Sequence, residues 1–181
     1  MKLVAFDGDH TLWTPLHGVC LSDRTPTDDT GWPHFTYKAE SDNPLVIRRD
    51  DGARFALRPE AREVFEQLKQ SGVLVGVVSY NHEANIRRAL QAFGLADLVD
   101  FVVAEWHTNK DAMLGKMLAM AEANGHKLHA CDIMLVDDDP EKLYRGQCER
   151  MGAGFVCFGS EIEDLREVAG MLGTTPTGPS E

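Results

Sequence analysis

Long apolar runs are absent from this sequence. No stretch approaches the roughly 18 consecutive apolar residues that a membrane-spanning helix requires. Asp7 and Asp9 also interrupt the first apolar segment, which argues against a secretory signal peptide. We therefore expect no membrane partner, and we expect the protein to work in the cytoplasm.

Paired cysteines are absent too. The cysteines form neither a Cys-x-x-Cys pair nor the Cys/His spacing that is typical of a zinc site. They are Cys20, Cys131, Cys148 and Cys157. We expect reduced thiols that act as small core or surface residues.

Positive charge is scarce. The chain has 18 Lys and Arg residues against 29 Asp and Glu residues, which gives a formal net charge of −11. Because nucleic-acid affinity comes largely from Lys and Arg neutralising phosphates, we expect no nucleic-acid partner. A phosphorylated substrate would have to be attracted locally, by a few cations or by a metal ion.

The length and composition of the chain fit one domain of ordinary size. Apolar side chains make up 43% of the 181 residues, which is enough for one packed core. We place this single domain at residues 1–172. Residues 173–181 contain no apolar anchor, so we expect them to be a disordered tail.

Short apolar runs alternate with segments of helical periodicity. This alternation predicts an α/β fold with a doubly wound, Rossmann-like parallel sheet of about five strands. The strands are expected at 2–6, 73–78, 101–104, 133–136 and 154–158, and the helices near 59–71, 82–93, 111–123 and 161–171. A β-hairpin is expected at 45–57 around the turn signal Asp51-Gly52. Residues 14–57 thus form a flap and hairpin insertion after the first strand, and we expect no large cap domain.

Polar residues follow the carboxyl ends of the predicted strands. Because such ends meet at one crevice of an open α/β sheet, these residues should become neighbours. They are Asp7, Asp9, Ser79, Lys110 and the run Asp137–Asp139. Carboxylates packed this closely repel one another unless a hard cation lies between their oxygens, and Mg²⁺ prefers oxygen ligands. We therefore predict a magnesium site with ligands Asp7, Asp9 and one or more of Asp137, Asp138 and Asp139.

This set of residues indicates phosphoryl transfer through an aspartyl-phosphate intermediate. Asp7 is the expected nucleophile, and Asp9 is the expected acid for the leaving oxygen and base for the attacking water. Ser79 and Lys110 are expected to hold phosphate oxygens. Lys116 competes for the lysine role, but Lys110 is favoured because it lies at the boundary between loop and helix.

Further substrate contacts are expected near the same strand ends. Thr11 and Tyr80 are candidates, and so is Asn81, which should cap the helix starting near residue 82 and bring its backbone amide near the phosphate. His10 and His107 could contact substrate or be ordinary solvated or packed histidines.

Four segments, FDGDHTLW, VVSYN, NKDAML and MLVDDDP, resemble in order the four motifs of the haloacid dehalogenase superfamily. The resemblance covers most of the chain and is strongest to the capless, magnesium-dependent phosphatases of that superfamily. It implies hydrolysis of a phosphomonoester, either a small phosphorylated compound or a phosphorylated protein side chain. By this resemblance Asp7 is the nucleophile, Asp9 the acid and base, and Asp138 the metal ligand, with Asp137 as a supporting neighbour.

Parts of the sequence depart from that pattern. Gly8 stands where related sequences carry an apolar residue, and Tyr80 stands where the related phosphatases carry Arg, which puts their substrate preference in doubt here. The stretch 14–44 is also longer than in those relatives and is a candidate flap over the crevice. It carries Trp32, His34, Phe35 and Tyr37, whose rings could pack on a substrate or on the domain itself.

Other functions fit less well. A signalling receiver would carry its phospho-accepting Asp after the third strand, where only Glu105 is available. A dehalogenase would leave Asp9 and the run Asp137–Asp139 unexplained. A transferase that loads a glyceryl group onto a carrier protein has a similar opening motif and stays an alternative, as does a non-catalytic binding module.

Overall fold

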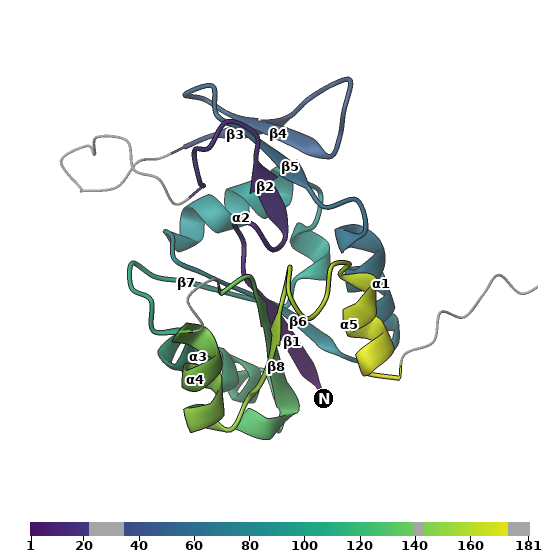
Figure 1. Cartoon of the computed structure of the whole chain (residues 1–181), viewed down its shortest axis with the longest axis vertical. Helices are drawn as coiled ribbons and strands as arrows, with labels where there is room; N and C mark the ends of the chain where they lie inside the picture. The colour runs from purple at the N-terminus through teal and green to yellow at the C-terminus, as the bar shows by residue number, and fades with distance from the viewer. Residues whose placement is uncertain (22–34, 140–142, 174–181) are drawn as a thin grey trace, which may run out of the picture.

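The five apolar runs form one parallel sheet in the computed structural model, which describes residues 1–21, 35–139 and 143–173 (Figure 1). The strands are β1 (Leu3–Phe6), β6 (Leu74–Ser79), β7 (Phe101–Ala104), β8 (Ile133–Asp137) and β9 (Gly154–Cys157). Their order is β7-β6-β1-β8-β9, so the chain winds outward from β1 in both directions. The predicted α/β class and doubly wound sheet are confirmed.

Helices cover both faces of this sheet. They are α1 (Ala61–Gln70), α2 (Glu83–Ala92), α3 (Lys110–Ala123), α4 (Leu143–Met151) and α5 (Arg166–Met171), with short 3₁₀ helices η1 (Ala96–Leu98) and η2 (Ala130–Asp132). In β1, Val4 and Phe6 pack with residues of α1, α2 and α5, while Leu3 and Ala5 pack with residues of α3 and α4. Because both faces of the sheet are buried, its strands are apolar throughout instead of alternating.

The insertion after β1 forms a second, antiparallel sheet, drawn above the first in Figure 1. Its strands are β2 (Trp13–Pro15), β3 (Tyr37–Ala39), β4 (Val46–Arg49) and β5 (Arg54–Leu57), in the order β2-β5-β4-β3. Strands β4 and β5 are the predicted hairpin, and Gly52 in their turn has a φ of 93°, which favours glycine. Within the described residues the insertion contains this sheet and no large cap domain.

Of the four residues named in the predicted flap, the structure describes Phe35 and Tyr37. Phe35 is buried under the guanidinium of Arg49, 4.0 Å from its ring centroid, and Tyr37 packs edge-on to Phe55. Trp32 and His34 lie outside the described residues. The two rings that the structure describes therefore pack within the small sheet, and a flap that closes over the crevice stays a prediction.

Several elements differ from the expectation based on sequence. The sequence pattern does not predict helix α4, because its buried residues are Gln147 and Cys148, which do not make an apolar stripe. The last helix begins at Arg166, and not near 161, because the chain first makes a turn in which Phe158 bridges to Ile162. Strands β2 and β3 have three residues each, too few for a periodic signal.

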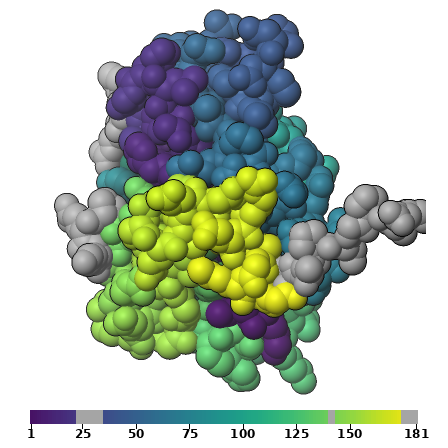
Figure 2. All heavy atoms as spheres, turned by 45° about the vertical axis from the view of Figure 1, so that its right-hand side comes forward, coloured from purple at the N-terminus to yellow at the C-terminus, as the bar shows by residue number. Residues whose placement is uncertain are grey.

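The C-terminal segment, yellow in Figure 2, packs between the small sheet and the half of the molecule that carries α3 and α4. One contact that ties it to the insertion joins the guanidinium of Arg58 to the ring of Phe158, 4.0 Å away. Of the predicted disordered tail, residues 174–181 lie outside the described part of the chain. None of the helices in the described part has both the length and the apolar character needed to cross a membrane.

Candidate active site

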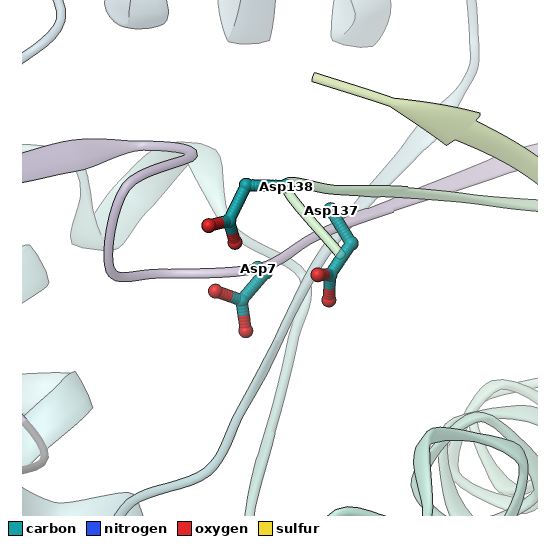
Figure 3. Close-up of side chains that lie close together, drawn as sticks. All are labelled: Asp7, Asp137 and Asp138. Carbon is teal, nitrogen blue, oxygen red and sulfur yellow. The ribbon is translucent and has the colours of Figure 1, made fainter. Parts of the chain in front are cut away.

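The candidate site lies at the carboxyl ends of β1 and β8, where the strand order reverses. Asp7 directly follows β1 and its backbone N–H donates to the carbonyl of Val136 at 2.9 Å, while Asp137 is the last residue of β8. In Figure 3 the carboxylates of Asp7, Asp137 and Asp138 gather on one side of these strands, and one oxygen from each lies within 4.8 Å of the others. The structure therefore brings these three predicted residues together.

A buried lysine contacts two of these carboxylates. Lys110 is the first residue of α3, and its side chain is 1% exposed. Its Nζ contacts Asp7 Oδ1, lies 3.0 Å from Asp137 Oδ2, and donates to the carbonyl of Val78 at 3.2 Å. One positive charge thus faces several negative charges with little water between them.

The start of α3 is held by Gln147 of α4. Its Oε1 accepts the backbone N–H of Lys110 at 2.6 Å, and its Nε2 donates to the carbonyl of Thr108 at 3.0 Å. The first N–H groups of a helix have no partner within the helix, so this side chain acts as a remote cap. The competing Lys116 is 57% exposed and contacts Glu105. The geometry therefore favours Lys110 for the lysine role.

Burial and mutual repulsion disfavour ionisation of the clustered carboxyls. Burial raises the pKa of Asp7 to about 8, although Lys110 opposes the shift, and Asp137 adds to it. The pKa of Asp138 is also raised, first by burial and then by Asp137. Burial works to lower the pKa of Lys110, but Asp7 and Asp137 outweigh it and raise that pKa above its usual value. Lys110 alone thus does not neutralise the cluster.

Asp9 lies beside this cluster but is not part of it. Its Oδ1 accepts the indole N–H of Trp13 and the backbone N–H of Leu21, both at 2.9 Å. It nevertheless lines the same cavity of about 200 Å³ as Asp7 and Lys110. The Asp9 carboxylate is therefore held by partners outside the predicted metal cluster, which suits the predicted acid and base better than the predicted metal ligand.

Trp13 is the side chain among the described donors that holds the Asp9 carboxylate, together with the backbone of Leu21. Its side chain is completely buried and stacks on Phe93 with ring centroids 5.8 Å apart. Gly8 packs against the same ring, because a Cβ atom at Gly8 would lie only 2.5 Å from Trp13 Cζ2. Gly8, which stands where related sequences carry an apolar residue, thus leaves space for the indole ring that donates to Asp9.

We expect Trp13→Phe to lower kcat about tenfold or more, because it keeps a ring but removes the N–H group that orients the Asp9 carboxylate. Steady-state kinetics and a melting curve on the same preparation would measure this. Phe93→Leu is the matched control: it disturbs the packing of the indole but leaves its hydrogen bond, so it should reduce stability more than kcat. An unchanged kcat in folded Trp13→Phe would contradict the assigned role of the indole.

The other predicted substrate contacts fall into two groups. Ser79 and Tyr80 line the cavity, as does His10, whose backbone is left-handed with a φ of 65°. Thr11 and Asn81 are completely buried and are not among the lining residues, so direct contact with a substrate stays a prediction for both.

The structure also tests two expectations about residues near the cavity, the cap of α2 and the place of His107. The prediction that Asn81 caps α2 is wrong: the helix begins at Glu83 with His82 as its N-cap, and Asn81 Oδ1 accepts the backbone N–H of His82 at 2.7 Å. His107 is not among the cavity residues, and its Nε2 lies 2.8 Å from Glu105 Oε2.

The three aspartates after β8 have different environments. Asp137 is buried against Lys110, and Asp138 lines the cavity with a partly exposed side chain. Asp139 is buried and caps α4, because its carboxylate accepts backbone N–H groups from the first turn of that helix. The donors are Leu143, Tyr144 and Arg145, at 2.8 to 3.1 Å. The acidic run therefore supplies two cluster residues and one helix cap.

Sequence reasoning missed several residues that shape the site. Cys20 and Tyr144 line the cavity, and Gln147 holds the start of α3. Arg58 donates from Nη2 and Nε to the carbonyls of His10 and Thr11, at 2.7 Å each, and so fixes the loop that carries Asp9. Each of these contacts joins segments far apart in the sequence, so no local pattern could have revealed it.

The carboxylate cluster has the chemistry of a magnesium site. All three members are aspartates, which provide hard oxygen donors, and their oxygens are close enough to share one ion. Burial is the largest cause of the raised pKa of Asp7 and of Asp138, and a cation between their oxygens would favour the charged carboxylates again. Asp7, Asp137 and Asp138 are thus the residues that fit a divalent cation.

Fold and site together define a doubly wound α/β protein with an acidic pocket at its topological switch point. The family model of the haloacid dehalogenase-like hydrolases matches residues 47–145, more than half of the chain. The chain belongs to this family. The matched range contains Ser79, Lys110 and Asp138, and it begins after Asp7 and Asp9.

Solved structures with this fold come from several bacteria. An uncharacterized protein from Listeria monocytogenes serotype 4b is 20% identical, with a TM-score of 0.61 over 95% of this chain and 97% of that one. A predicted phosphoglycolate phosphatase from Haemophilus somnus 129pt is 16% identical, with a TM-score of 0.63 over 94% and 97%.

A third structure is the N-terminal part of a Bacteroides fragilis protein, which contains a phosphatase domain and is complexed with Mg. It is 17% identical, with a TM-score of 0.58 over 96% of this chain and 40% of that one. At these identities the three likenesses establish the fold alone. No curated protein matches the chain.

Proposed function

We propose that this protein is a capless, magnesium-dependent phosphomonoester hydrolase that works through an aspartyl-phosphate on Asp7. The observation that carries the proposal is the contrast between two carboxylates that line one cavity. Asp7 is clustered with Asp137 and Asp138 and contacts Lys110, whereas Asp9 is held apart by Trp13 and Leu21. Two carboxyl groups in different environments suit two different chemical roles.

The reaction has two steps. First, an oxygen of Asp7 attacks phosphorus, the bond from phosphorus to the leaving oxygen breaks, and Asp9 gives that oxygen a proton. Then Asp9 takes a proton from water, the water oxygen attacks phosphorus, and the bond to Asp7 breaks, which releases phosphate and restores both carboxyl groups. Lys110 and Ser79 offset negative charge on the phosphoryl oxygens. Magnesium, when bound, supplies the positive charge that lets an anionic ester approach these carboxylates.

Family membership supports hydrolysis as the reaction class. The names of two structural neighbours, one a predicted phosphoglycolate phosphatase and one a phosphatase domain complexed with Mg, agree with a phosphate ester and this metal. The expected substrate is a small phosphorylated compound or a phosphorylated protein side chain in the cytoplasm, with neither nucleic acid nor membrane as a partner.

The proposal is tested by the release of inorganic phosphate from a panel of phosphomonoesters, with Mg²⁺ and with excess chelator. We expect release only with the metal. Undiminished release in chelator would contradict the metal requirement. If no ester of the panel releases phosphate, the hydrolase function is refuted. Transfer of the ester's organic group to an added carrier protein would favour the transferase instead.

Substitution of Asp137, the last residue of β8, and of Asp138, in the loop that follows, should have different effects on metal binding and stability. Asp138→Ala is expected to weaken Mg²⁺ binding on the order of 100-fold, because it removes a carboxylate that faces the cavity. Asp137→Ala should weaken binding less and destabilise the fold more, by roughly 2 kcal/mol, because buried Lys110 loses one of its partners.

Isothermal titration with Mg²⁺ and thermal unfolding would separate the two effects. Asp97→Ala, which removes an exposed aspartate of η1, is the control for a general change in charge. Equal losses of affinity at Asp137 and Asp138 would show that the distinction between them is wrong.

A further inference from the structure

The side chains that line the cavity of Asp7 include more acidic than basic groups. The cavity measures about 200 Å³, which leaves room for a phosphoryl group and a few further atoms. Four of its lining residues are aspartates, and among the lining residues that the structure describes the only lysine or arginine is Lys110. The remaining lining residues are His10, Cys20, Ser79, Tyr80 and Tyr144.

That lysine is already engaged. Its Nζ contacts Asp7 and Asp137 and donates to the carbonyl of Val78, and its side chain is 1% exposed. It therefore cannot reach outward to a second anionic group on the substrate while it serves the phosphoryl group. In the first step of the proposed reaction Asp9 carries a proton, so a bound divalent cation and Lys110 together balance the three clustered carboxylates and leave no positive charge over for a second anionic group.

Two cationic or ionisable side chains near the cavity in the described part of the chain, Arg58 and His10, make other contacts. The Arg58 guanidinium is not among the lining groups; it donates to the carbonyls of His10 and Thr11 and lies over the ring of Phe158. The imidazole of His10, which does line the cavity, has its Nε2 3.5 Å from the Sγ of Cys20. The described cavity wall thus offers no arginine or free lysine for a substrate carboxylate.

Tyr80 is an exposed residue of this wall, as is His10. Tyr80 follows Ser79, the last residue of β6, and is 38% exposed, whereas Ser79 is 2% exposed. Its ring is held edge-on to Trp106, with centroids 5.1 Å apart and an interplanar angle of 90°. A ring fixed in this way offers an apolar surface to a leaving group and no charge.

We propose that the substrate is a phosphomonoester whose leaving group carries no negative charge, and that Tyr80 is a residue that determines this specificity. The inference rests on the proposed phosphatase function and names the substrate class of the same site. Among the described residues a carboxylate on the leaving group would find no cation and would lie near Asp9 as Asp9 gives up its proton, and we expect this to lower kcat/KM by about tenfold to a hundredfold at an effective dielectric constant of about 20.

Two small esters of similar size test the proposal: phosphoglycolate, with a carboxylate, and 2-hydroxyethyl phosphate, with an uncharged hydroxymethyl group in its place. The ratio of their kcat/KM values is measured with Mg²⁺ at low and at high salt. We expect the wild-type protein to prefer the hydroxyl compound at least about tenfold, and we expect added salt to reduce that preference by screening.

Variants locate the origin of the preference. Tyr80→Arg should raise the relative kcat/KM for phosphoglycolate about tenfold, whereas Tyr80→Phe should leave the ratio near that of the wild type. Met171→Arg makes the same change in charge at a 54% exposed residue of α5 that does not line the cavity, and it should leave the ratio unchanged.

Each outcome has a defined meaning. Equal or better turnover of phosphoglycolate by the wild type overturns the proposed substrate class and leaves the phosphatase standing. A ratio that folded Tyr80→Arg does not change, or that Met171→Arg changes as much, overturns the role of Tyr80. Release of phosphate from neither ester, nor from an aryl phosphate, removes the phosphatase function and this inference with it.

Discussion

Asp7→Asn is expected to abolish turnover while the protein stays folded. Without the carboxylate no acyl phosphate can form, so kcat should fall by roughly four powers of ten or more. The amide has nearly the shape of the carboxylate, and its oxygen can still contact Lys110. The backbone N–H of residue 7, which donates to the carbonyl of Val136, is unaffected. The expected product is therefore a folded, inactive protein.

The same substitution should stabilise the metal-free protein at neutral and higher pH. Burial raises the pKa of Asp7 from 3.8 to about 8, so the folded state binds this proton more tightly than the unfolded state does. For an acid shifted in this direction, stability is lost as the pH rises from the lower pKa to the higher one. The asparagine does not ionise, although it gives up part of the attraction to Lys110. The melting temperature of the variant in chelator should exceed that of the wild type near pH 8 and approach it near pH 5.

Phosphate release and calorimetry on the same samples would measure both effects, with Asp97→Asn as a control for the loss of one exposed carboxylate. Turnover above about 1% of the wild-type rate in folded Asp7→Asn would exclude Asp7 as the nucleophile. A melting-temperature difference that does not change with pH would show that burial does not control the Asp7 carboxyl.

The main sheet could be predicted from sequence because its strands carry a strong local signal. Each strand is a short apolar run, and β1 and β8 end where the sequence changes to aspartate. Parallel strands joined by helices leave few topologies, and these bring the strand ends to one edge. Asp7, Lys110, Asp137 and Asp138 could therefore be placed together although they are more than 100 residues apart at the extremes.

The supporting contacts could not be predicted, since they depend on tertiary packing. Nothing around Gln147 indicates that its amide caps a helix that begins 37 positions earlier. Arg58 reaches the loop of His10 across 48 positions. The Asp9 carboxylate could be placed near the crevice, but its direction is set by Trp13 and by Leu21, in a stretch of sequence with no regular pattern.

Asp9→Asn is expected to behave differently from Asp7→Asn, because phosphorylated protein should accumulate. The hydrogen bonds that Trp13 and Leu21 donate to the Asp9 carboxylate both go to Oδ1, and an asparagine carbonyl oxygen can accept the same two. The loop should therefore keep its shape, while the side chain can no longer give or take a proton. An aryl phosphate has a leaving group that needs little protonation, so Asp7 is still phosphorylated, and hydrolysis of the intermediate slows by roughly 100-fold to 10,000-fold.

Intact mass spectrometry after mixing Asp9→Asn with Mg²⁺ and an aryl phosphate should show one added phosphoryl group, stable in acid and lost on treatment with hydroxylamine, as an acyl phosphate requires. The double variant with Asp7→Asn should remain unlabelled, which ties the label to Asp7 and not to the metal cluster in general. A label that resists hydroxylamine would instead be a phosphate ester, with Ser79 as a hydroxyl-bearing candidate in the cavity wall. That result, or a label in the double variant, would refute the aspartyl-phosphate mechanism even for a working phosphatase, because the group attacking phosphorus would then not be the carboxylate that contacts Lys110.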